Sequence, residues 1–189
     1  MENKQKVYFA VLVLLLGSNI YFFSQYRWYQ RAELFSHELK INRAHFGIMT
    51  ASQYAGELRD RWDRLTSHEK SSWLSDITRE LTVAENALSI IVHFNLESRT
   101  EVKSASREAN LLGFYAGTLR TTQYVLNEEN DAEAKAAVAV IADDLAILAN
   151  RFNEDEVKQM TSREFYQLFD EIIADLTHED VVNVFHREP

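Results

Sequence analysis

Cysteine is absent from this chain of 189 residues, and proline and glycine are scarce. Without cysteine there is no disulfide framework, no thiolate metal site and no cysteine nucleophile. Proline occurs once, as Pro189, and glycine occurs five times. Sheet folds need turn residues at regular spacing, whereas long helices joined by short polar turns do not. The sequence therefore predicts an all-α fold, of a length that fits one domain with a short appendage.

The sequence motifs of common enzymes are missing as well. The chain has no glycine-rich phosphate loop, no nucleophile elbow and no H-E-x-x-H motif. Helical bundles that hold two metal ions between carboxylates use E-x-x-H on two helices, and no E-x-x-H occurs here. We therefore predict a non-enzymatic function, with no catalytic residue and no cofactor.

Positive charge is also in short supply, and the net charge of −9 is spread unevenly. Residues 24–110 hold 12 acidic and 12 basic side chains, whereas residues 111–189 hold 16 acidic and 6 basic ones. A nucleic-acid-binding protein needs clustered lysine and arginine to displace the counterions of the phosphates. The acidic C-terminal half would repel phosphate, so nucleic acid is excluded as a predicted partner.

What the sequence does contain is an apolar opening, "VYFAVLVLLLGSNIYFF". Residues 7–23 carry no charge, and at about 1.5 Å per residue they cross most of a hydrocarbon core of about 30 Å. A short tail, residues 1–6, precedes them. A signal peptide is disfavoured because the run lacks a small-x-small cleavage pattern. We expect a retained transmembrane anchor, with a cleaved signal peptide and a buried soluble helix as the alternatives.

A belt of rings and arginines follows the apolar run, within residues 24–33. Aromatic side chains with an apolar body and a polar tip favour the membrane interface, and arginines reach from it toward water. The predicted membrane-interface residues are Tyr26, Arg27, Trp28, Tyr29 and Arg31. An uncleaved apolar helix after a short tail is the common form of a signal anchor. We therefore expect a single-pass protein of the cell membrane, its N-terminus cytoplasmic and its C-terminal domain outside.

Three small or polar residues interrupt the apolar run: Gly17, Ser18 and Asn19. Small residues let transmembrane helices approach closely, and a side-chain amide can form a hydrogen bond to a neighbouring span. These residues are candidates for association between spans. The alternative is that Asn19 lies near the edge of the bilayer and contacts interfacial water.

After this belt at residues 24–33, apolar residues recur at helical spacing. They predict a first long helix that continues from the anchor into a bundle domain over residues 34–189. Their spacing of three, four or seven residues forms a seam that faces partner helices. The seam residues are Leu34, Ile41, Ala44, Ile48, Ala51, Ala55, Leu58 and Trp62.

Further helices follow from caps and periodicity. Thr66 and Glu69 form a capping box, which predicts that a second helix begins near Ser67. Apolar seams over residues 74–91, 102–126 and 134–152 predict the second, third and fourth helices. Four amphipathic helices with short connections fold most readily as an antiparallel bundle. Two short helices after residues 161 and 177 complete the prediction.

One acidic stretch, "DEIIADLTHED", gathers most of the ionisable side chains near the C-terminus. Oxygen ligands of this kind suit a divalent cation. The weak candidates for metal ligands are Asp170, Glu171, Asp175, His178, Glu179 and Asp180. The stretch lacks the glycine and the spacing of a calcium loop. The alternative is a polar corner between two helices, with acidic residues favoured in the first turn by the helix dipole.

Together these features predict a membrane-anchored, non-enzymatic helical bundle. The expected partners are the lipid bilayer and another protein, with self-association into a homo-oligomer as a further expectation. The expected contact surface is the acidic C-terminal half or the alanine-lined first helix. A ligand-binding sensory bundle is the first alternative, and a metal-dependent enzyme that uses the acidic corner is the second.

Overall fold

The computed structural model describes residues 2–91, 106–160 and 162–185; the side chains of residues 2–7, 9–13, 30, 32–37, 90, 91, 106 and 162 are not described. Every regular element among these residues is a helix, and none is a strand, which confirms the all-α prediction. The elements are α1 (Glu2–Arg61), the 3-10 turn η1 (Trp62–Arg64), α2 (Ser67–Ile91), α3 (Ser106–Val125), α4 (Asp131–Arg151), α5 (Glu154–Val157), α6 (Ser162–Asp175) and α7 (Glu179–Phe185). The chain forms two units, Met1–His37 and Glu38–Pro189, and α1 contributes to both.

The N-terminal unit is helical, and its described side chains are exposed. Across the described part of the chain, no helix combines the length and the apolar composition needed to cross a membrane. The predicted transmembrane anchor over residues 7–23 is therefore not supported. Among the side chains that are described, Gly17, Ser18, Asn19 and Ser24 interrupt the apolar composition. The side chains of residues 9–13 lie outside the described ones.

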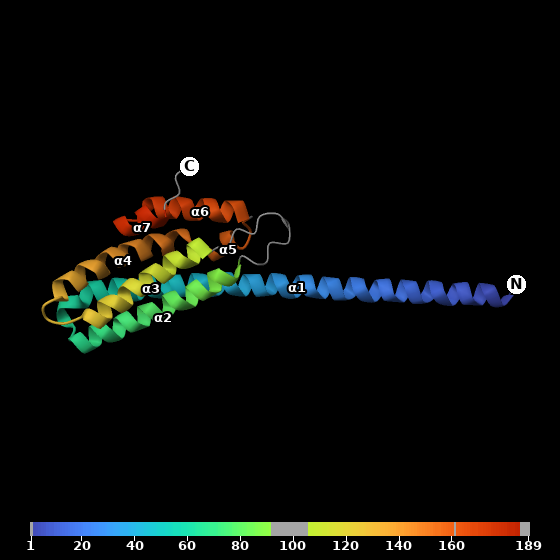
Figure 1. Cartoon of the computed structure of the whole chain (residues 1–189), viewed down its shortest axis with the longest axis horizontal. Helices are drawn as coiled ribbons and strands as arrows, with labels where there is room; N and C mark the ends of the chain where they lie inside the picture. The colour runs from blue at the N-terminus through green and yellow to red at the C-terminus, as the bar shows by residue number, and fades with distance from the viewer. Residues whose placement is uncertain (1, 92–105, 161, 186–189) are drawn as a thin grey trace. The chain divides into compact units, whose positions relative to one another are not determined.

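In the second unit, α1 and α4 pack in opposite directions, and Figure 1 shows them within one group of helices. His45 contacts the carbonyl oxygen of Phe152 at 2.7 Å, and Arg59 donates to Asp143 at 2.6 Å. Residue numbers rise along α1 as they fall along α4, so the two helices are antiparallel. These contacts fix which face of α1 is turned toward α4.

The α2 and α3 pair is antiparallel as well. The side-chain amide of Gln123 donates to the carbonyl oxygen of Ser71 at 3.1 Å. Farther along both helices, Gly113 of α3 lies beside the carboxylate of Glu85 of α2, and a Cβ added to Gly113 would be 2.7 Å from Oε1 of Glu85. Figure 1 shows α2 and α3 beside the C-terminal part of α1 and α4. The second unit is thus a helical bundle.

The core of the bundle is filled by large side chains from most of its helices. Trp62, Tyr115, Phe152 and Phe169 are all fully buried. The Phe152 and Phe169 rings lie 6.0 Å apart in an edge-to-face arrangement, and this contact joins α4 to α6. Within this dense packing three charged side chains are buried as well: Lys70, Glu108 and Asp144.

The helix starts agree with the caps seen in the sequence. The backbone N–H of Thr66 donates to Glu69 at 2.8 Å, and the N–H of Glu69 donates back to the Thr66 hydroxyl at 3.3 Å. This capping box is confirmed, and α2 begins at Ser67 as predicted. The short helix α5 was not predicted, because a single turn capped by Asn153 leaves no periodic pattern.

Candidate partner-binding surfaces

The N-terminal unit carries a long series of exposed apolar side chains. Their exposed fractions range from 54% to 74%, and they are Tyr8, Leu14, Leu15, Leu16, Ile20, Tyr21, Phe22, Phe23, Tyr26, Trp28 and Tyr29. The predicted interface residues Arg27 and Arg31 are exposed beside them. The guanidinium of Arg27 lies 5.8 Å from the ring centre of Phe23, a cation–π distance. Contiguous apolar surface of this kind marks a site that contacts lipid or another protein.

The polar side chains among the candidates for span association form hydrogen bonds within their own helix. The hydroxyl of Ser18 donates to the carbonyl oxygen of Leu14 at 2.9 Å, and the amide of Asn19 donates to that of Leu15, also at 2.9 Å. Nothing lies within 4 Å of a Cβ added at Gly17. The three residues are exposed. Local hydrogen bonds of this type satisfy polar side chains on a helix without a partner.

The predicted seam of the first helix faces the bundle interior. Ile41, Ala44, Ile48, Ala51, Ala55, Leu58 and Trp62 are at most 1% exposed, and the side chain of Leu34 lies outside the described ones. Gly47 on the same helix lies so close to α2 that an added Cβ would be 2.8 Å from the carbonyl oxygen of Glu80. The small residues thus bring α1 and α2 together. The alanine-lined face is covered, so it is not available to a partner.

The acidic corner is divided among separate ion pairs. Asp170 pairs with Arg107 of α3. Glu171 and Asp175 both pair with Arg151 of α4, at 2.7 and 3.4 Å. Each of these three carboxylates on α6 therefore faces a guanidinium of α3 or α4. These pairs attach α6 to the bundle.

The remaining candidates of this corner lie apart from those pairs. The His178 ring packs edge to face against the rings of Phe114 and Tyr115, at 5.5 and 6.4 Å. Glu179 and Asp180 are exposed in the first turn of α7. Within the described residues, no group of three or more histidine or acidic side chains is placed to hold a metal ion. The structure does not bring the six candidate ligands together.

A different carboxylate, which the sequence did not single out, organises this region. Asp144 of α4 is fully buried and accepts from the Tyr115 hydroxyl at 2.7 Å. It also accepts from the backbone N–H and the hydroxyl of Thr177, at 2.6 and 2.7 Å, and from the N–H of His178 at 3.2 Å. Burial and then the bond to Asp144 raise the pKa of Tyr115, so its hydroxyl stays a donor. Asp144 thereby caps the start of α7 from another helix.

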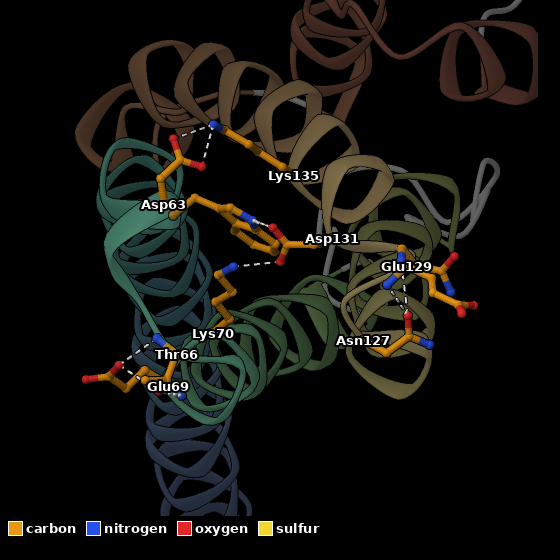
Figure 2. A network of polar contacts seen from close by, with 10 residues as sticks. Asp63, Thr66, Glu69, Lys70, Asn127, Glu129, Asp131 and Lys135 are labelled. Carbon is orange, nitrogen blue, oxygen red and sulfur yellow. Dashed lines mark hydrogen bonds and ion pairs between the residues drawn. The ribbon is translucent and has the colours of Figure 1, made fainter.

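A second polar network joins the two turns at one end of the bundle, and Figure 2 shows it from close by. Asp131 accepts from Lys70 at 2.6 Å and from the indole N–H of Trp62 at 3.1 Å. Lys70 is buried and lies 4.7 Å from the ring centre of Trp62. Lys135 bridges to Asp63 at 2.7 Å. The hydrogen bond from Lys70 lowers the pKa of Asp131. The network ties the start of α4 to the end of α1 and the start of α2.

Two open grooves lie on the outside of the bundle. The groove between α2 and α3 has a volume of about 450 Å³, a floor of Gly113, Ala116 and Gly117, and charged rims at Glu85 and Arg120. The groove between α1 and α4 has a volume of about 330 Å³. Its lining carries no charge: Phe46, Met49, Thr50, Ser52, Gln53, Ala146, Ala149 and Asn150.

No family model, no curated protein and no solved structure matches this chain. What the bundle offers to a partner is therefore argued from its own surface. On the C-terminal half, six exposed carboxylates form no ion pair with another described residue: Glu128, Glu129, Glu133, Glu156, Glu179 and Asp180. We refer to these six residues as the free acidic set.

Proposed function

We propose that this chain is a non-enzymatic helical bundle, attached to a membrane, that holds a partner protein with a basic surface. The observation that carries the proposal is the free acidic set, together with 16 acidic against 6 basic residues over 111–189. Acids that pair inside the fold contribute to its structure, whereas unpaired exposed acids contribute a field that attracts a basic partner. The alanine-lined face of α1 is buried, so the acidic half is the better contact surface of the two.

Attachment to the membrane is proposed through residues 7–31. It is supported by the exposed apolar side chains of this segment and by the rings and arginines that follow them. Proximity to a bilayer would also limit the set of partners to proteins at the same membrane.

A ligand-binding sensory bundle is the second candidate, and the groove between α2 and α3 is the feature that favours it. The opposite charges of Glu85 and Arg120 on its rims suit a small polar molecule. The groove is open along the outer surface, and the core beneath it is filled by large side chains. We therefore rank this function below partner binding.

The test compares three forms of the full chain, purified from membranes in mild detergent with whatever protein accompanies it. One form is native, and a second has glutamine or asparagine at the free acidic set. A control form carries Asp76→Asn and Glu85→Gln, outside the acidic half. The partner should accompany the native and control forms, be lost from the second form, and dissociate as salt rises because exposed charges are screened.

Equal recovery with all three forms would contradict the role of the acidic surface. Membrane attachment is checked on the same material by deletion of residues 1–29. The full chain should float with lipid vesicles, and the shortened chain should stay in the aqueous fraction as a folded helical domain. Flotation of the shortened chain, or its aggregation, would contradict attachment through residues 7–31.

A further inference from the structure

The outer face of α1 carries a line of uncharged side chains that no other helix covers. Its members are Leu39, Asn42, Phe46, Met49 and Gln53, and we call this line the outer stripe. Leu39, Phe46 and Met49 are 52%, 67% and 43% exposed, and the two amides are exposed as well. All five residues belong to the bundle unit, and three of the five, Phe46, Met49 and Gln53, also line the groove between α1 and α4.

The spacing of the outer stripe is that of a helix–helix seam. Its residues follow one another at intervals of three, four, three and four, which places them on one face of the helix. Phe46 is two residues from both Ala44 and Ile48, or about 200° around the helix from each. Those two residues are fully buried. α1 therefore has two seams on opposite faces, of which the fold covers one.

We propose that the outer stripe packs in parallel against the outer stripe of a second copy of this chain. Five uncharged residues meet their own copies across the two-fold axis without repulsion, although each copy carries a net charge of −9. Asn42 both donates and accepts, so its amide can pair with the same amide of the second copy.

The charged residues beside the stripe favour the second copy and its direction. Leu39 and Phe46 take the first position of two successive heptads. Arg43 then takes the fifth position of the heptad that begins at Leu39, and Glu38 takes the seventh position of the heptad before it. In parallel pairs, residues at these two positions form salt bridges between the helices. Glu38 and Arg43 have opposite charges, both are exposed, and neither pairs with another described residue. Two Glu38–Arg43 contacts would therefore form across the two-fold axis.

The surface that flanks the stripe on the side of α4 is uncharged as well. Small side chains of α4, Ala146 and Ala149, line the groove between α1 and α4, and no charged residue does. Uncharged surface beside the seam adds no charge repulsion between two copies. The parallel direction also lets both N-terminal units reach the same bilayer, a point that rests on the proposed function.

The absence of cysteine permits a direct test, because any disulfide must come from an introduced residue. Full-length chains with Asn42→Cys, Phe46→Cys or Thr121→Cys are oxidised mildly in detergent. Thr121 is exposed on α3, far in sequence from the stripe, and serves as the control. Disulfide-linked dimers should form at positions 42 and 46, with at least about tenfold less at position 121, because identical residues meet only along the seam of a parallel pair.

Charge reversal then tests the pairing of Glu38 with Arg43. Glu38→Arg or Arg43→Glu alone, each in the Phe46→Cys chain, should lower the linked fraction by about tenfold, and the double reversal should restore it. Unchanged linking in the single variants, or linking at position 121 equal to that at 46, would overturn the proposal. So would a monomeric mass of the native chain by light scattering, or a dimer without linkage at positions 42 and 46.

The experiment separates this inference from the proposed function. It is carried out in detergent without vesicles or partner, so a dimer that forms through the stripe stands even if the acidic surface binds nothing. Conversely, a monomeric chain that floats with vesicles and retains its partner would contradict the pairing of the outer stripes, but not the proposed function.

Discussion

The two units of this protein differ in how far they expose aromatic side chains of the same types. Trp28 of α1 is 63% exposed, whereas Trp62 of η1, the turn that directly follows α1, is fully buried. Phe22 and Phe23 are exposed, whereas Phe152 of the bundle is fully buried. Composition therefore does not decide burial in this chain. In the bundle unit, other helices cover rings such as Trp62 and Phe152, whereas Phe46 and Tyr124 stay exposed.

This contrast shows where the stability of the fold resides. A buried ring removes apolar area from water at about 25 cal/mol per Å² and gains contacts on every side. An exposed ring gains neither, so it adds little to the stability of the fold. The bundle unit is thus stabilised from within, and the N-terminal unit is available for contacts outside the chain.

The largest expected effect comes from matched tryptophan substitutions. Trp62→Ala should lower the free energy of unfolding by about 4 kcal/mol, since it leaves a cavity and removes the indole donor to Asp131. Trp28→Ala should change it by less than about 0.5 kcal/mol, as exposed substitutions do. Urea unfolding of the full chain in detergent, followed by circular dichroism, measures both. Equal losses would break the contrast between the units.

Two neighbouring aspartates sharpen the contrast within the bundle. Asp144→Ala should cost about 3 kcal/mol of unfolding free energy, because it leaves the buried hydroxyl of Tyr115 without an acceptor and removes both bonds from Thr177. Asp143→Ala removes only an exposed pair with Arg59 and should cost less than about 1 kcal/mol. The same unfolding measurement gives the stability loss of each variant. An equal loss for Asp143→Ala and Asp144→Ala would contradict the structural importance of the buried hydrogen bonds of Asp144.

The helical class and much of the bundle could be predicted because they depend on local patterns. The capping box at Thr66 fixes the start of α2, and the spacing from Ile41 to Trp62 marks the covered face of α1. Both signals lie within a few turns of one helix. Such signals do not depend on knowledge of which helices are neighbours.

The features that were missed depend on contacts between distant parts of the chain. Asp144 lies beside the apolar position Leu145, and nothing in its surroundings in the sequence indicates that Thr177 will meet it 33 residues later. The candidate metal ligands are close in sequence, yet Arg107 and Arg151 draw three of them into separate ion pairs. Pairing across helices decided the role of each acid.

Glycine substitutions should have smaller effects of opposite sign. Gly47→Ala places a Cβ 2.8 Å from the backbone oxygen of Glu80 and 3.0 Å from the Cβ of Ala84, so α1 and α2 must separate. We expect a loss of about 1–2 kcal/mol in unfolding free energy, because overpacking outweighs the gain in helix propensity. At Gly56 nothing lies within 4 Å of an added Cβ, so Gly56→Ala should stabilise by about 1 kcal/mol. A stabilising Gly47→Ala would show that this close approach is not required.

The smallest effect is a pH dependence that belongs to the bundle alone. The hydrogen bond from Lys70 lowers the pKa of Asp131 in the folded chain. A carboxyl with a lowered folded pKa stabilises the fold above its unfolded pKa of about 3.9, and this contribution is lost as the pH falls through the folded value. The side chain of Asp131 is 37% exposed, so solvent screening keeps the contribution below about 1 kcal/mol.

Asp131→Asn should therefore lower the unfolding free energy at pH 7, and its difference from the native chain should shrink as the pH falls below about 4. The control is Glu128→Gln, an exposed carboxyl outside the network, whose difference from the native chain should stay near zero at both values of pH. Urea unfolding at pH 7 and pH 3 gives the four differences. A difference for Asp131→Asn that persists undiminished at pH 3 would assign its effect to the bond from Trp62 to Asp131, which does not require the charge of the carboxylate.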